Sequence, residues 1–332
     1  MKKNLLIYVE DPRFGGPHQF TLNILDYLKS DFNISVLFSN IESQIFLKKI
    51  KLKKIKYDTF HISFLSLELF RILKYILYFF FEVYKIRNYL KKKRIDIIYS
   101  ISGFYSVKII IASLFLRIKI VTHFHDTFCN LIFLYLGYFT RSFIDLFVFS
   151  SKKSFLFYRK FIGEKKYLII QSGIYVKDEN KINAKKSKVF NIVSISNINP
   201  IKGIEFLLEI SKKFKDRNIK FHLIGNVWKS QMKYYKKIRE KAKLEKLSNI
   251  KFYSQLNKEK IRKILLNSDL YLCLSKYESS PMAVWEAMSY SLPVITTDVG
   301  DLAYFNKIYK FGFIIKRKNI KNVQEKILSI YF

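Results

Sequence analysis

Two glutamates, Glu278 and Glu286, lie eight positions apart in the segment KYESSPMAVWEAMSYSLPVITTDVGD. Carboxylates accept hydrogen bonds, so a pair that faces one cleft can bind the hydroxyl groups of a sugar or of a nucleotide ribose. The spacing alone is weak support, because two acids often fall this far apart by chance. The value of the pair as a candidate site therefore depends on the elements around it.

A strand, a loop and a helix are predicted to position this pair. The apolar run over 270–274 predicts a buried strand, and a helix is expected to start at Pro281, with the two serines before it as caps. The free amides of Met282 and Ala283 would then face the loop, where a helix N-terminus suits a phosphate or a ribose hydroxyl. Ligands of open α/β sheets bind at the carboxyl ends of strands, so this loop is predicted to bind a ligand.

A lysine and two histidines are further candidates. Lys202 lies in a predicted strand-to-helix loop, SISNINPIKGIEFLLEI, where an ammonium group can act as a point-charge ligand for phosphate; it could equally be one surface lysine among many. His123 and His125 point to the same face of a predicted strand, so a metal pair must be considered. No further histidine, cysteine or carboxylate cluster completes such a site, so we expect no metal, and we expect His123 to be a buried, hydrogen-bonded structural residue.

The order of predicted elements indicates two α/β domains. Short apolar runs alternate with helical patterns in two series, which is typical of doubly wound parallel sheets. The polar stretch DENKINAKKSK over 178–188 separates the series, and we place the domains at residues 1–180 and 181–332. The predicted strands are Leu5–Val9, Ile34–Phe38, Ile97–Ser100, Ile118–Thr122, Leu146–Phe149, Phe190–Ile195, Lys220–Ile224, Ile250–Phe252, Leu270–Leu274, Val294–Thr296 and Gly312–Ile315.

The chain is strongly basic, with 60 Lys and Arg against 26 Asp and Glu and a net charge of +34. Such a field attracts nucleic acid, anionic lipid or phosphorylated ligands, although an AT-rich genome would also enrich lysine. Residues 48–94 carry +11 and contain the aromatic segment FLSLELFRILKYILYFFFEVYKIRNYL. We predict a basic amphipathic helix whose charged stripe includes Glu82; it would either rest on an anionic membrane or pack on a sheet with that stripe in solvent.

The cellular location is predicted from cysteine usage and apolar runs. Two distant cysteines indicate neither a disulfide framework nor a zinc site, and the apolar run at the N-terminus is too short for a signal peptide. The longest uncharged run has 14 residues, short of the about 20 that span a bilayer. We therefore expect a cytoplasmic protein without a transmembrane helix, peripheral on the inner face of the plasma membrane.

The acidic pair and the Lys-Gly loop resemble motifs of retaining glycosyltransferases of the GT-B fold, family 4 (glycosyl transferases group 1), over nearly the whole chain. The resemblance implies two Rossmann-like domains that face a central cleft, an N-terminal one for the acceptor and a C-terminal one for a nucleotide-sugar. It assigns Glu278 to the donor sugar, Glu286 to the ribose and Lys202 to the pyrophosphate, and Gly203 to the turn of the backbone. Met282 and Ala283 would supply helix amides to the donor.

Two N-terminal motifs also resemble this family. EDPRFGGPHQFTLNIL is similar to the glycine loop after the first strand, so Gly15 and Gly16 would let the chain approach the donor phosphate or the acceptor. IVTHFHDTF is similar to a strand that ends in His-Asp, which assigns His125 to the transferred sugar. The sequence departs from the family at Asn197, because the second pyrophosphate-binding cation is absent there, and the C-terminal helices are short.

The resemblance predicts a metal-independent, retaining enzyme of the hexosyltransferase type, without cofactor. The acceptor would be a saccharide, or a lipid-linked saccharide of bacterial capsule, O-antigen lipopolysaccharide or similar polysaccharide biosynthesis. Asn197 and the short C-terminus leave a second hypothesis open, a non-catalytic glycosyltransferase-like subunit with a protein partner. A nucleic-acid-binding protein is a third hypothesis that we disfavour, because no RNA- or DNA-reading motif is present.

Overall fold

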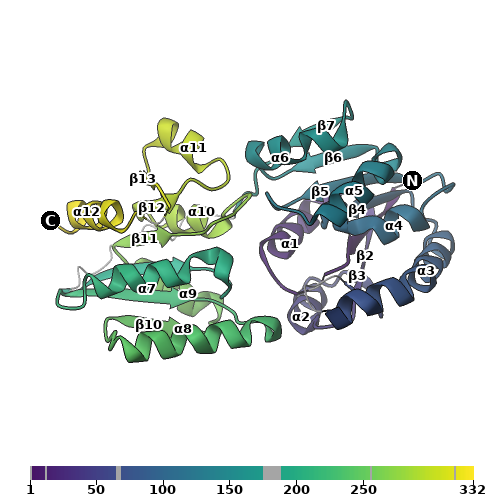
Figure 1. Ribbon diagram of the computed structural model, residues 1–332. Coiled ribbons are helices and arrows are strands. Elements are labelled where there is room, and N and C mark those ends of the chain that lie inside the picture. Colours follow the sequence, from purple (N-terminus) through teal and green to yellow (C-terminus); the bar gives the residue numbers. More distant parts are fainter. Residues whose placement is uncertain (1, 12, 65–68, 175–187, 255, 318) are drawn as a thin grey trace. The chain divides into compact units, whose positions relative to one another are not determined.

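The computed structural model describes residues 2–11, 13–64, 69–174, 188–254, 256–317 and 319–332 (Figure 1). The chain divides into two compact units, Met1–Ser172 and Gly173–Phe332, which are the N-terminal and C-terminal units below. The predicted domain boundary, between residues 180 and 181, lies outside the described residues.

The N-terminal unit is built on a parallel sheet with the strand order β3-β2-β1-β4-β5-β6-β7. Its strands are β1 (Lys3–Val9), β2 (Phe32–Ser39), β3 (Lys56–Phe60), β4 (Ile97–Ser100), β5 (Lys119–Phe124), β6 (Leu146–Phe149) and β7 (Tyr167–Ile169). Its α-helices are α1 (Gly16–Leu28), α2 (Gln44–Leu52), α3 (Leu69–Lys92), α4 (Val107–Ala112), α5 (Leu131–Thr140) and α6 (Lys152–Ile162).

The C-terminal unit repeats this plan with the strand order β10-β9-β8-β11-β12-β13. Its strands are β8 (Phe190–Ile195), β9 (Ile219–Ile224), β10 (Ile250–Tyr253), β11 (Leu270–Cys273), β12 (Val294–Thr297) and β13 (Gly312–Ile315). Its α-helices are α7 (Ile204–Lys212), α8 (Met232–Leu244), α9 (Lys258–Leu266), α10 (Met282–Ser289), α11 (Leu302–Tyr309) and α12 (Ile320–Tyr331).

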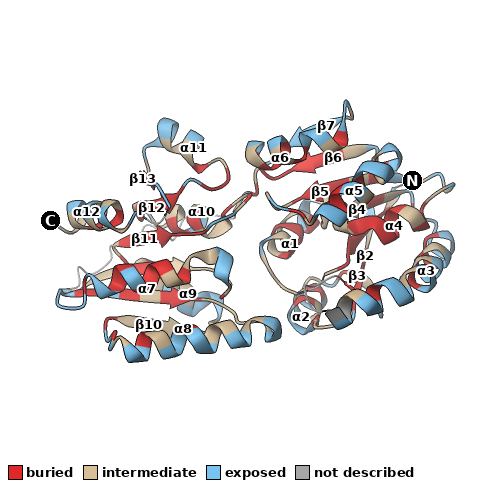
Figure 2. Cartoon of the chain, viewed as in Figure 1, coloured by how far each residue is buried: buried red, intermediate tan, exposed pale blue. Residues whose placement is uncertain are grey.

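Alternating side chains of the central strands fill cores on both faces of each sheet. In β8, Ile192 belongs to one buried cluster and the next residue, Val193, to another. Figure 2 shows the strands of both sheets largely in the colour of buried residues. Strands buried on both faces are typical of parallel sheets covered by helices, and they confirm the predicted fold class.

The strand order reverses direction at one point in each sheet. This point lies between β1 and β4 in the N-terminal unit and between β8 and β11 in the C-terminal unit. Loops that leave neighbouring strands there diverge to opposite faces, which opens a crevice at the carboxyl ends. The predicted site residues after β8 and β11 therefore lie at a position that favours ligand binding.

All predicted strands are confirmed, but two further strands were missed. The edge strand β3 is KYDTF and is only partly buried, and β7 is an exposed three-residue edge strand. A strand that pairs on one side only does not need the continuous apolar run from which the others were recognised. The sequence signal was therefore absent at these two edges.

The predicted charged stripe of α3 is wrong at Glu82. This carboxylate is buried, at 3% exposure, on the same side as Tyr75 and Ile86. The opposite side of α3 exposes large apolar residues (Figure 2): Phe70, Leu73, Ile76, Leu77, Tyr78, Phe80, Phe81 and Tyr84. Within the described ranges, no helix combines the length and the apolar character that crossing a bilayer requires.

Glu82 is buried because a lysine from α4 compensates its charge. Lys108 Nζ lies 2.8 Å from Glu82 Oε2, 3.5 Å from Glu10 Oε1 and 3.7 Å from the centre of the Tyr75 ring. Ser63 donates to Glu82 through its amide and its hydroxyl, at 2.8 and 3.0 Å. Removal from water raises the pKa of Glu10 to about 7, an effect that the nearby Lys108 ammonium only partly offsets.

The contribution of Glu10 to stability should depend on pH. The folded chain holds the Glu10 proton up to about pH 7, whereas the ordinary carboxyl pKa is 4.5. The native state therefore binds more protons in this window, and the unfolding free energy should fall as pH rises through it. A Glu10→Gln variant has no such proton, so its unfolding free energy relative to the wild type should rise between pH 4.5 and about 7 and then level off.

Urea unfolding at pH 5 and pH 8 measures this difference. Far-UV circular dichroism is the appropriate signal, because both tryptophans, Trp228 and Trp285, lie in the C-terminal unit. Glu240→Gln, at an exposed position of α8, is the matched control and should run parallel to the wild type. Parallel pH profiles for Glu10→Gln and the wild type would refute the shifted ionisation.

Candidate functional site

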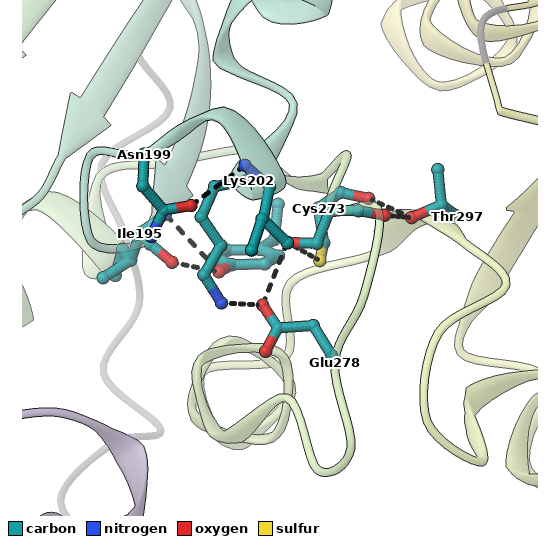
Figure 3. Close-up of polar contacts among 9 residues, drawn as sticks. Ile195, Asn199, Lys202, Cys273, Glu278 and Thr297 are labelled. Atoms are coloured by element: carbon teal, nitrogen blue, oxygen red, sulfur yellow. Dashed lines mark hydrogen bonds and ion pairs between the residues drawn. The ribbon is translucent and has the colours of Figure 1, made fainter. Parts of the chain in front are cut away.

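The loops after β8 and β11 bring Lys202 and Glu278 together. Lys202 Nζ forms an ion pair with Glu278 Oε1 (Figure 3). Ser275 Oγ donates to the same oxygen at 2.9 Å. The two charged side chains are 20% and 19% exposed, so both remain accessible to a ligand. The structure thus joins two residues that are 76 positions apart in the sequence and that were predicted to share a site.

Close backbone contacts hold these two loops against each other. Lys276 N–H donates to Ile201 O at 2.6 Å. Gly203 has a φ of +69°, and a Cβ at this position would lie 2.1 Å from Leu274 O. Only glycine combines this conformation with such a close approach, so the position of Lys202 depends on Gly203.

The residue types that support Glu278 were not anticipated from the sequence. Gly300 N–H donates to Glu278 O at 2.9 Å, with a φ of +53°, and Thr297 Oγ1 donates to Ser275 O at 2.6 Å. Tyr271 Oη donates to Ile195 O at 3.1 Å and thereby links β11 to β8. The only available signal was that these residues lie in or shortly after the predicted neighbouring strands over 270–274 and 294–296.

A pocket of about 400 Å³ adjoins this loop. It is lined at the carboxyl ends of β11, β12 and β13 by residues that include Ser275, Lys276 and Lys316. Its charged lining residues are Lys276, Lys316, Arg317 and Asp298, an excess of positive charge that favours anions.

The predicted start of the helix after Glu278 is wrong by one residue. Pro281 is the N-cap of α10, with a ψ of 79°, and no side chain caps the helix. Met282 N–H donates to Ser280 O at 2.9 Å, so it is not the free amide that was expected. The Ala283 amide has no hydrogen-bond acceptor among the described residues, which leaves one of the two predicted amides available.

Glu286 lies on α10 and is exposed to solvent. Its carboxylate has no hydrogen-bond or ion-pair partner in the described part of the chain. The surrounding protein raises its pKa by desolvation, and the charge of Lys258 opposes this shift. Glu286 can therefore accept hydrogen bonds from a ligand without giving up an existing contact.

The N-terminal unit places His123 and His125 at the carboxyl end of β5. Ser150 Oγ lies 3.0 Å from His123 Nε2 and 2.9 Å from His125 Nδ1. His123 is fully buried and hydrogen-bonded, which confirms its predicted structural role. Burial lowers the pKa of His123 to about 3, and burial and the two neighbouring histidines hold the pKa of His125 well below its usual range. Across the described residues, no three histidine, cysteine or acidic side chains gather as a metal site would require.

The glycine loop lies at the start of α1. Gly15 is the N-cap with an extended φ of −153°, and neither Gly15 nor Gly16 has a positive φ. A Cβ on Gly16 would meet no atom within 4 Å, so the fold itself does not require glycine at position 16. His18, which sequence analysis missed, accepts from Gly15 N–H through Nδ1 and donates to Asp11 O through Nε2 at 2.8 Å.

Two doubly wound units in one chain define the GT-B class of fold, and solved structures confirm this class. A glycosyltransferase of Rickettsia africae has a TM-score of 0.76 at 21% identity, covering 99% of this chain and 88% of that one. Alr3699/HepE of Anabaena, in complex with UDP and glucose, has a TM-score of 0.78 at 17% identity, covering 99% and 90%.

The C-terminal unit also matches a known family by sequence. Residues 176–331 match the model of the family described as Glycosyl transferases group 1. A Staphylococcus aureus poly(ribitol-phosphate) alpha-N-acetylglucosaminyltransferase is 30% identical over 139 residues, or 41% of this chain. An uncharacterized glycosyltransferase of Methanocaldococcus jannaschii is 28% identical over 131 residues, or 40% of this chain. The matches cover 27% and 35% of these relatives' own lengths.

Gly203→Ala should destabilise the C-terminal unit, whereas Gly16→Ala should leave stability nearly unchanged. An alanine at 203 requires a positive φ and overlaps the Leu274 carbonyl, a strain of about 1–3 kcal/mol or more. An alanine at 16 meets no atom within 4 Å and starts a helix. Thermal unfolding followed by circular dichroism measures both variants, and equal stability of the two would contradict this account of the loop contact.

Proposed function

We propose that the protein is a retaining, metal-independent glycosyltransferase that transfers a sugar from a nucleotide-sugar to a hydroxyl group. The observation that carries this proposal is the Lys202–Glu278 pair at the point where the strand order of the C-terminal sheet reverses. A cation and an acid at this position match the two parts of a sugar diphosphate, one anionic and one hydroxylated. The family match over residues 176–331 gives independent support.

In the proposed complex, Lys202 binds the diphosphate, Glu278 the donor sugar and Glu286 the ribose. A diphosphate would compete with Glu278 for the Lys202 ammonium, and this exchange is feasible because both side chains reach solvent. The free Ala283 amide adds a donor at the start of α10. Preorganised donors of this kind typically stabilise developing negative charge by about 3 kcal/mol each.

The chemical step proposed here needs no covalent enzyme intermediate. The acceptor oxygen attacks the anomeric carbon on the face from which the nucleoside diphosphate departs, so configuration is retained. The bond between that carbon and the diphosphate oxygen breaks, and the acceptor proton passes to the departing phosphate. His125 of the N-terminal unit would hold the transferred sugar, and the unpartnered Glu286 would hold the nucleotide.

The donor class follows from the solved relatives by analogy. Alr3699/HepE was solved with UDP-glucose, and Staphylococcus aureus TarM with UDP. A uridine nucleotide is therefore the first candidate.

The acceptor is proposed to be a lipid-linked saccharide at an anionic membrane surface, in bacterial surface polysaccharide biosynthesis such as capsule or lipopolysaccharide. Helices α3, α4 and α5 pack side by side over one hydrophobic core of the N-terminal unit. The outer sides of α3 and α5 form what we call the aromatic face. Its members are Phe70, Leu73, Ile76, Leu77, Tyr78, Phe80, Phe81, Tyr84, Leu131, Ile132, Tyr135, Tyr138 and Phe139, each at least 42% exposed.

Cations lie among these apolar side chains. Lys74 Nζ lies 4.5 Å from the centre of the Phe70 ring, and Lys85 Nζ lies 5.5 Å from that of Phe81. Residues 48–94 carry a net charge of +11. Aromatic and aliphatic side chains among cations are typical of surfaces that rest in the interface of an anionic bilayer.

Sugar nucleotides should stabilise the protein through Lys202 and Glu286. At 100 times its dissociation constant, a ligand adds about 2.7 kcal/mol to the unfolding free energy. Thermal unfolding is measured with UDP-, GDP- and ADP-sugars, and one nucleotide class should raise the melting temperature. Lys202→Ala and Glu286→Ala should lose most of this shift, because each removes a proposed donor contact.

Lys321→Ala and Glu325→Ala, at exposed positions of α12, are the matched controls and should keep the shift. Release of nucleoside diphosphate from the responding donor then tests turnover. Absence of a shift with every donor would refute the proposed function. A shift without any turnover or transfer would instead favour the non-catalytic subunit.

The aromatic face should bind vesicles that contain anionic lipid. The wild type should float with phosphatidylglycerol vesicles more than with phosphatidylcholine vesicles, and salt should weaken the binding. Leu77→Gln combined with Phe80→Gln should lower the partition coefficient at least about tenfold, because burial of each apolar side chain contributes about 1.5–3 kcal/mol.

Tyr304→Gln combined with Tyr309→Gln is the matched control, because these tyrosines are also largely exposed, at 63% and 65%, but lie on α11. This variant should bind like the wild type. Equal loss of binding in both double variants, or no binding by the wild type, would contradict the proposed surface.

A further inference from the structure

Four side chains of the N-terminal unit form a continuous hydrogen-bonded chain that ends at His125. Tyr99 Oη contacts His123 Nδ1, His123 Nε2 contacts Ser150 Oγ at 3.0 Å, and Ser150 Oγ contacts His125 Nδ1 at 2.9 Å. Tyr99 lies in β4 and His123 in β5, whereas His125 directly follows β5 and Ser150 directly follows β6; the three strands are neighbours in the sheet. His125 Nε2 is buried and has no hydrogen-bond partner in the described residues.

The protons in this chain can be arranged in only two directions. A serine hydroxyl has one proton, and these two ring nitrogens are the only partners of Ser150 Oγ among the described residues, so Ser150 donates to one histidine and accepts from the other. A neutral histidine likewise donates from one ring nitrogen and accepts at the other. Both rings are neutral, because burial lowers the pKa of His123 and that of His125. The direction at one end therefore fixes the direction at the other.

Tyr99 selects the direction. Burial raises its pKa, so the phenol keeps its proton, and the described residues offer no acceptor for that proton other than His123 Nδ1. Tyr99 therefore donates to His123 Nδ1, His123 Nε2–H donates to Ser150, and Ser150 donates to His125 Nδ1. The opposite direction would leave the phenolic proton without an acceptor in the protein.

We propose that Tyr99, His123 and Ser150 are positioning residues that hold His125 in the tautomer with its proton on Nε2. His125 is then a hydrogen-bond donor to a ligand oxygen. The Phe20 ring, with its centre 5.3 Å from that of His125, restricts the ring from the side of α1. If the proposed function is correct, the acceptor of this bond is a hydroxyl oxygen of the transferred sugar.

Nitrogen-15 NMR tests the tautomer on the full chain without any donor present. The protein contains five histidines, so selective labelling of histidine gives five ring systems. His125→Gln and His123→Gln assign the two signals. We expect His125 to show a protonated Nε2 and an unprotonated Nδ1 in long-range proton–nitrogen correlations. A protonated Nδ1, or a signal averaged between both forms, would overturn the proposal.

Variants of the hydrogen-bonded residues test what fixes the tautomer of His125. Ser150→Ala and Tyr99→Phe should each leave His125 as a mixture of tautomers, because the fixed direction is lost. His18, which donates to Asp11 O from Nε2, is an internal reference whose signal should not change. Ser113→Ala is the matched control, because this buried hydroxyl donates to Ile110 O instead. An unchanged His125 signal in both Ser150→Ala and Tyr99→Phe would refute the positioning role.

Transfer assays separate this proposal from the proposed function. If the wild type transfers sugar, Ser150→Ala and Tyr99→Phe should lower kcat/KM about tenfold, the value of one neutral hydrogen bond. Ser113→Ala should transfer like the wild type. If the wild type transfers no sugar, the proposed function fails, while the NMR spectrum still decides whether the tautomer is fixed.

Discussion

The contact between the loops after β8 and β11 is the constraint on which the candidate site depends. The two strands are neighbours, so the segments directly after them lie in contact before the chain turns to opposite faces of the sheet. Gly203 permits this contact because the Leu274 carbonyl occupies the position of a side chain. Lys202 and Glu278 are thereby held as a pair by backbone geometry, before any interaction between their charges is considered. The sheet order thus determines the chemistry of the site.

Burial decides what each of the two lysine-centred clusters can do. Lys108 is completely buried between two glutamates and a tyrosine ring, and breaking such a pair leaves an uncompensated charge at a cost of about 3–5 kcal/mol. Lys202 and Glu278 are each about one-fifth exposed, so water can replace either partner. The first cluster is consequently a fixed element of structure, whereas the second can exchange its partner for an anionic ligand.

The sequence allowed prediction of features that depend on local pattern, and it failed where distant residues decide. Buried strands were recognised from apolar runs, but the edge strands β3 and β7 lack such runs. The inward orientation of Glu82 depends on Lys108, 26 positions away, and helical periodicity contains no information about that partner. The series of hydrogen bonds from Tyr99 to His125 was missed for the same reason, since it joins three strands. Lys202 and Glu278 were found because the family resemblance supplied the long-range pairing.

The composition of the aromatic face separates two partners that net charge cannot distinguish. A charge of +34 attracts nucleic acid and anionic lipid alike. Proteins that bind single-stranded nucleic acid stack bases on aromatic rings, a contact that aliphatic side chains do not provide. Leu77, Leu131 and Ile132 are each more than 60% exposed among the rings of α3 and α5. Aliphatic side chains gain free energy by burial among acyl chains, whereas they gain nothing from phosphate, so the composition of this face supports the proposed lipid surface over nucleic acid.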